Sequence, residues 1–80
     1  MYLSNLEKLN LAYNGIDGNC IDHFFPTLQM LRSLSELCLS SNNLDYDAIK
    51  RVTEKLPMLN VLDVTYNNSG EEQTGMESIY

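Results

Sequence analysis

The chain has 80 residues, of which 44% are hydrophobic, and a formal net charge of −6 at pH 7. This length corresponds to one domain with a small core, because chains of this size bury only about 60% of the surface that they expose when unfolded. The acidic balance argues against nucleic acid and anionic membranes as partners, since like charges repel one another.

A twelve-residue pattern, L-x-x-L-x-x-L-x-(L/V)-x-x-N, accounts for much of the chain. Near the end of each copy the apolar residues alternate, which is typical of a short strand with one buried face. Three strands are therefore predicted near residues 9–11, 37–39 and 62–64. The copies span residues 3–14, 31–42 and 56–67.

The linker after the first copy changes to helical spacing. Its apolar residues predict a helix on about residues 19–31. Pro26 lies inside this stripe, where it removes a backbone donor and clashes with the preceding turn. We therefore expect a short helix at about 19–25, followed by a kink or a second turn. The apolar stripe comprises Ile21, Phe24, Phe25, Leu28 and Leu31.

The second linker predicts a cleaner helix over residues 47–56. Ile49, Val52 and Leu56 form its apolar stripe. Asp47 is the expected N-cap and forms an i,i+4 pair with Arg51. The proline that follows Leu56 should end the helix there. Because each strand reaches the next through a crossover of a dozen or more residues, the three strands should be parallel.

The recurring pattern resembles the leucine-rich repeat, L-x-x-L-x-L-x-x-(N/C)-x-L, over roughly residues 3–68. Ile16 completes the first copy and Leu44 the second, whereas the third has Ser69 at that position. Leu6 and its equivalents recur after 28 and then 25 residues. The resemblance implies an α/β solenoid with three short parallel strands on the concave side and helical linkers on the convex side. The long units are similar to the ribonuclease-inhibitor class.

This interpretation divides the chain into a domain of about three repeats at 1–68 and an acidic, flexible tail at 69–80. The resemblance also implies that the asparagine ending each copy joins a ladder of hydrogen bonds between coils. These structural asparagines are Asn14, Asn42 and Asn67.

Residues with catalytic or metal-binding chemistry are sparse. His23 is the only histidine, and it has no serine or cysteine partner at a recognisable motif spacing. Cys20 and Cys38 fall in different elements, and neither has a second cysteine at metal or redox spacing. We expect reduced thiols, no cofactor and no enzymatic activity. Without a signal-peptide pattern or a membrane-length apolar stretch, a cytoplasmic location is expected.

A binding surface is the remaining functional feature. With the strand leucines buried, the intervening residues should line the concave face, where the resemblance implies a protein or peptide partner. Tyrosine suits such a surface because it joins a large apolar area to a polar tip. The predicted partner-binding residues are Lys8, Asn10, Tyr13, Glu36, Cys38, Ser40, Ser41, Val61, Asp63, Thr65 and Tyr66.

Size restricts this prediction. Three strands give a face of about 14 by 16 Å, enough for a short peptide but small for a whole protein. The alternative function is therefore a structural segment of a larger solenoid or assembly. We expect the first strand to form an apolar edge that no coil of this sequence covers. We expect a second copy, a partner or further repeats to cover it.

Overall fold

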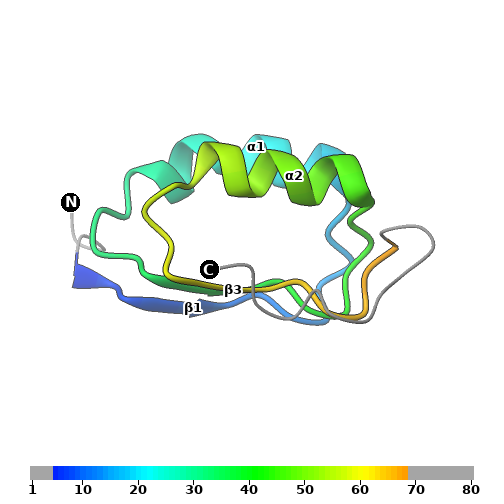
Figure 1. The fold of residues 1–80 in the computed structure, drawn as a ribbon, viewed down its shortest axis with the longest axis horizontal. Coiled ribbons are helices and arrows are strands. Elements are labelled where there is room, and N and C mark those ends of the chain that lie inside the picture. The colour runs from blue at the N-terminus through cyan, green and yellow to red at the C-terminus, as the bar shows by residue number, and fades with distance from the viewer. Residues whose placement is uncertain (1–4, 69–80) are drawn as a thin grey trace.

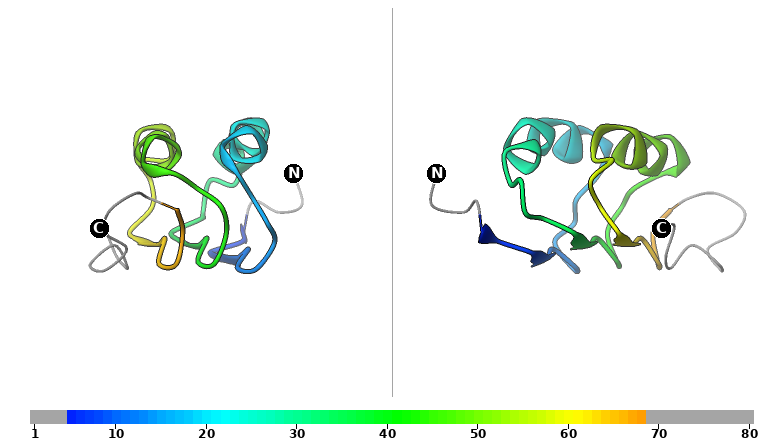
Figure 2. Two further views of the ribbon diagram at one scale, coloured as in Figure 1. Left: turned by 90° about the vertical axis from the view of Figure 1, so that its right-hand side faces the viewer. Right: turned by 60° about the vertical axis from the view of Figure 1, so that its left-hand side comes forward.

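The computed structural model describes residues 5–68, which form three strands and two helices in two layers. Both helices lie side by side on one face of a three-stranded sheet, and no helix or strand of residues 5–68 covers the other face (Figures 1 and 2). The tail predicted at 69–80 lies outside the described residues. In chain order the elements are β1 (Lys8–Asn10), α1 (Gly18–Gln29), β2 (Glu36–Cys38), α2 (Tyr46–Lys55) and β3 (Val61–Asp63).

The sheet has the order β1-β2-β3, and both strand pairs are parallel. Leu9, Leu37 and Leu62 stand opposite one another in the register. The predicted parallel strands and helical crossovers are therefore confirmed, with each strand beginning one residue earlier than expected. Backbone pairing also continues beyond the strands, since Asn43 N donates to Ile16 O at 2.8 Å. The coils thus stay in register as far as the start of the helices.

The core lies between the sheet and the helices. Leu37 and Leu62 are 1% and 0% exposed, and they belong to one hydrophobic cluster with the buried residues of both helices. Burial of such side chains is the main stabilising contribution in a domain of this size. The buried helical residues are Ile21, Phe25 and Leu28 in α1 and Ala48, Ile49 and Val52 in α2.

Helix α1 differs from the prediction that it would stop near residue 25, because it runs on through Pro26 to Gln29. Phe25 and Leu28 are buried on either side of the proline, and the proline itself is exposed. Tertiary packing on both flanks therefore outweighs the lost backbone bond. Phe24, expected in the apolar stripe, is among the exposed large hydrophobic residues, since the buried stripe follows spacings of four and three.

The N-cap of α1 is an aspartate that was not predicted from the sequence. Asp17 accepts a hydrogen bond from Cys20 N at 2.9 Å, which satisfies a free donor of the first turn. The hydrogen bond from the backbone N–H of Cys20 lowers the pKa of Asp17 below its ordinary value, and a smaller contribution comes from the Cys20 thiol.

The N-cap of α2 is also displaced from the prediction. Asp45, and not Asp47, accepts from Ala48 N at 2.8 Å. The helix begins at Tyr46, so Asp47 lies in its first turn. Arg51 pairs with Asp22 of α1, with 3.0 Å between Nε and Oδ1, in place of the predicted pair within the helix.

The end of α2 follows the prediction closely. The helix ends at Lys55 with Leu56 as its C-cap, directly before Pro57.

Within residues 5–68, neither helix has the length and apolar character needed to cross a membrane.

Candidate functional site on the open face of the sheet

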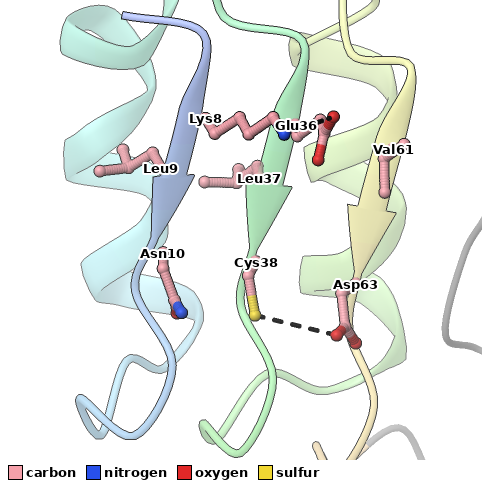
Figure 3. A pocket seen from close by; sticks show the side chains of 8 residues that line it. All are labelled: Lys8, Leu9, Asn10, Glu36, Leu37, Cys38, Val61 and Asp63. Carbon is pink, nitrogen blue, oxygen red and sulfur yellow. Dashed lines mark hydrogen bonds and ion pairs between the residues drawn. The ribbon is translucent and has the colours of Figure 1, made fainter.

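We call the surface opposite the helices the open sheet face. It comprises the outward residues of the three strands and the turns that follow them. The register sets these residues in rows across the sheet, as Figure 3 shows. The first row is Lys8, Glu36 and Val61, and the second is Asn10, Cys38 and Asp63.

These two rows line a shallow hollow of about 370 Å³. The structure thus brings together six of the eleven predicted partner-binding residues. Leu9 and Leu37 also contribute to the lining. They were not predicted, because a strict alternation assigns both entirely to the core.

The first row contains an ion pair. Lys8 Nζ lies 3.7 Å from Glu36 Oε2 on the adjacent strand. Both side chains are exposed, so the pair contributes at most about 1 kcal/mol. Opposite charges at equivalent positions of successive repeats would have indicated this contact in the sequence. Val61, the third member of the row, is an exposed apolar side chain.

The second row contains a half-buried carboxylate held by local bonds. Asp63 Oδ1 accepts from Thr65 N at 3.1 Å and from Thr65 Oγ1 at 2.8 Å. Its Oδ2 faces the Cys38 thiol at 3.8 Å, marked in Figure 3. Cys38 Sγ also lies 3.4 Å from Ser40 Oγ. These contacts draw predicted residues of the second and third coils into one cluster.

The first coil has a matching local bond. Asn10 Oδ1 accepts from Ala12 N at 2.9 Å, as Asp63 accepts from Thr65. Both are turns in which a side-chain oxygen bonds to the backbone two residues later. An amide and a carboxylate can therefore support the same backbone at the end of the strand.

A further row follows the strands and has an unusual backbone. Tyr13, Ser41 and Tyr66 have φ angles of 61°, 57° and 60°. The left-handed conformation disfavours non-glycine residues by roughly 1–2 kcal/mol. Tyr13 is 81% exposed and Tyr66 74% exposed. The three residues thus share one backbone conformation, and the hollow is lined by the two strand rows instead.

Two buried asparagines brace the turns that follow this row. Asn42 Oδ1 accepts from Asn14 N at 3.0 Å and from Ile16 N at 2.9 Å. Asn67 makes the corresponding bond to Leu44 N at 2.9 Å. Each therefore joins its own turn to the preceding coil.

Asn14 differs from the other two repeat asparagines. It is exposed, and its side chain bonds to Ala12 O in its own turn at 3.1 Å. Its partner is therefore local, whereas those of Asn42 and Asn67 include backbone of a neighbouring coil.

Two of the three residues with catalytic or metal-binding chemistry lie outside the open sheet face, and only Cys38 lies on it. Cys20 and His23 are exposed residues of α1, on the helical side of the sheet. His23 Nδ1 lies 2.8 Å from Asn19 O. Within the part of the chain that the structure describes, both cysteines are free and no group of three or more His, Cys, Asp or Glu residues is placed to hold a metal ion.

Comparison with curated proteins found no significant match. Comparison with solved structures also found none. A family model described as Leucine Rich Repeat matches residues 5–28, which contain β1, the turn after it and most of α1. Such repeats generally mediate protein–protein interaction and are generally not enzymes. The three parallel strands and two helices fit an α/β repeat fold, and the match at residues 5–28 supports a leucine-rich repeat there.

Proposed function

We propose that the protein is a protein-interaction module, an adaptor, scaffold or regulatory subunit, that binds through the open sheet face. In this proposal the face is the concave side of a solenoid of ribonuclease-inhibitor-like repeats. The observation that carries this proposal is the difference between the two faces of the sheet. One face packs against both helices, while the other presents exposed or half-buried residues in register across three strands.

The dimensions favour a peptide as the immediate ligand. Three strands at about 4.8 Å spacing make a face only about 14 Å wide from edge to edge. A whole-protein interface of standard size needs about 800 Å² from each partner. An extended segment of a partner protein therefore fits the face better than a broad, flat surface.

This function can be tested by selecting peptides that bind the folded chain from a random peptide library and measuring their affinities. Peptides that bind the open sheet face should lose at least about tenfold in affinity with the double variant Tyr13→Ala, Tyr66→Ala, because exposed tyrosines are frequent anchors of binding. The matched control is Phe24→Ala, Tyr46→Ala, which removes two exposed aromatic residues from the helices. Loss of binding only in the control would place the site on the helical side.

The alternative, a structural segment of a larger assembly, is favoured by a separate observation. Leu6, Leu9 and Leu11 are only partly buried, whereas Leu34 and Leu37, which match Leu6 and Leu9 in the second copy, are each 1% exposed. Strand β1 also forms one edge of the sheet, and an open edge is a template for pairing with another chain. A second copy, a partner or further repeats would cover this edge in the functional state.

Sedimentation of two forms of the protein tests the alternative. One is the chain itself, and the other carries an added polar capping repeat before residue 3. Self-association is expected only for the uncapped chain, because the cap covers the apolar edge. A stable monomer of the uncapped chain at high concentration would contradict an assembly role.

A further inference from the structure

We propose that the open sheet face selects an arginine-containing, extended segment of its partner, with the guanidinium bound to the Asp63 carboxylate beside the tyrosine row. This inference rests on the proposed function and specifies the chemistry of the ligand. It is carried by an uncompensated carboxylate, its fixed orientation, and the exposed aromatic residues in the adjoining turns.

The charges of the residues that line the hollow single out Asp63. Glu36 is paired with Lys8, and Asp22 with Arg51. Among residues 5–68, Asp63 is the carboxylate of the hollow that no basic side chain neutralises. The net charge of −6 over the whole chain adds a long-range attraction for a cationic segment.

The carboxylate is already oriented for a ligand. Thr65 donates twice to Oδ1, through its backbone N–H and its hydroxyl. Oδ2 receives only the thiol of Cys38 at 3.8 Å, and a thiol is a weak donor. This oxygen therefore keeps the capacity to accept a charge-assisted bond from a guanidinium. Because the side chain is held before binding, little freedom is lost when the ligand arrives.

The aromatic residues favour arginine over lysine. Tyr13 and Tyr66 belong to the outer coils, about 10 Å apart at a coil spacing of about 4.8 Å, with the small Ser41 between them. Both tyrosines are largely exposed. A guanidinium stacks on aromatic rings and forms directed hydrogen bonds, whereas an ammonium is a compact, strongly hydrated charge. One extended chain can lie between the tyrosines with an arginine directed toward Asp63.

The first experiment uses the unmodified protein. The ¹⁵N-labelled chain is titrated at low salt with acetyl-Gly-Arg-Gly-Arg-Gly-amide and with the same peptide carrying citrulline, a neutral analogue of arginine. The arginine peptide should shift the amide signals of residues 63–66 and 40–41, and the citrulline peptide should bind about tenfold more weakly. Equal affinities, or no shifts at the open sheet face, would overturn the inference.

The second experiment separates a local contact from general attraction. Asp63→Asn removes one negative charge from the face, and Glu54→Gln removes one from the exposed surface of α2. The Asp63→Asn backbone should be retained, because Asn10 makes the same bond in the first coil. We expect about a tenfold loss of arginine-peptide affinity for Asp63→Asn and little change for Glu54→Gln. Equal losses would overturn the local contact.

The two proposals fail in different ways. If selected library peptides require the tyrosines but show no preference for arginine and no effect of Asp63→Asn, this inference is wrong and the proposed function stands. If the double tyrosine variant binds every peptide unchanged, the open sheet face is not the site and both are wrong.

Discussion

At the residue scale, the repeat asparagines show how one side chain joins two coils. Asn42 accepts backbone bonds from the preceding coil through Oδ1, and its Nδ2 donates to Leu11 O and Leu39 O at 3.0 Å each. The amide thus provides both acceptors and donors where the chain has left the strand ladder. Because Asn42 is buried, water cannot readily replace these bonds if the side chain is removed.

The variant Asn42→Ala should lower the free energy of unfolding by about 1–3 kcal/mol, since it leaves several buried backbone groups without partners. Asn43→Ala and Asn14→Ala should change stability by no more than about 0.5 kcal/mol, because both side chains are exposed. Urea unfolding of the three variants measures these differences. Equal midpoints for Asn42→Ala and Asn43→Ala would contradict the bracing role of Asn42.

The tyrosine row shows where residue-level prediction from sequence stops. The exposure of this row follows from the sequence pattern, because Tyr13 and Tyr66 come after the strands and occupy none of the apolar positions of the repeat. Their left-handed backbone does not follow, because neither is a glycine or an asparagine. Bonds between coils accompany it. Beside Tyr66, Asn67 Nδ2 donates to Leu39 O, and beside Tyr13, the backbone N–H of Asn14 donates to Asn42 Oδ1. These bonds form only when the coils are stacked.

At the element scale, the strands and helices were predictable because each has its own hydrophobic period. The alternation of apolar residues located all three strands to within one residue. Helix ends were harder to predict, since Asp45 and Asp47 both satisfy the local preference for an N-cap. The choice depends on the extent of pairing between coils, because residue 45 is bridged to Asn68 and so still belongs to the extended segment.

Replacing each aspartate of this pair in turn tests the assignment of the cap. Asp45→Ala should destabilise the protein by about 1 kcal/mol, because it removes the acceptor for Ala48 N. Asp47→Ala should lower the free energy of unfolding by less than about 0.5 kcal/mol, since Asp47 lies in the first turn and only its charge interacts favourably with the helix dipole. Thermal unfolding of both variants under the same conditions makes the comparison. A larger destabilisation by Asp47→Ala than by Asp45→Ala would contradict the assignment of Asp45 and support Asp47 as the N-cap.

The candidate site was predictable in part, more than the helix ends and less than the strands. Its rows could be derived from the sequence, because the repeats set the register and the strand period sets the outward positions. The contacts within the second row required the structure, since the thiol of Cys38 and the carboxylate of Asp63 are 25 residues apart in the sequence and meet through side-chain geometry. Binding by these residues remains a prediction.

At the scale of the whole molecule, burial differs between the two outer strands of the sheet. Leu37 of the inner strand β2 and Leu62 of the outer strand β3 are both almost fully buried, at 1% and 0% exposure. Their counterpart Leu9 in β1 is only partly buried, so the less covered edge of the core is the β1 side. In stacked repeats, stability is approximately the sum of contributions from each unit and each interface between neighbours.

Equivalent leucines should therefore differ in energy although the repeat pattern treats them alike. Leu37→Ala should destabilise the protein by about 2–5 kcal/mol, because it leaves a cavity among buried neighbours. Leu9→Ala should cost distinctly less, since part of this side chain already meets solvent and less apolar area is lost. Urea unfolding of both variants at low protein concentration, where the chain is monomeric, gives the two values. At concentrations that permit self-association, the cost of Leu9→Ala should rise toward that of Leu37→Ala if an added coil covers β1. An unchanged difference at every concentration would show that the β1 edge stays open.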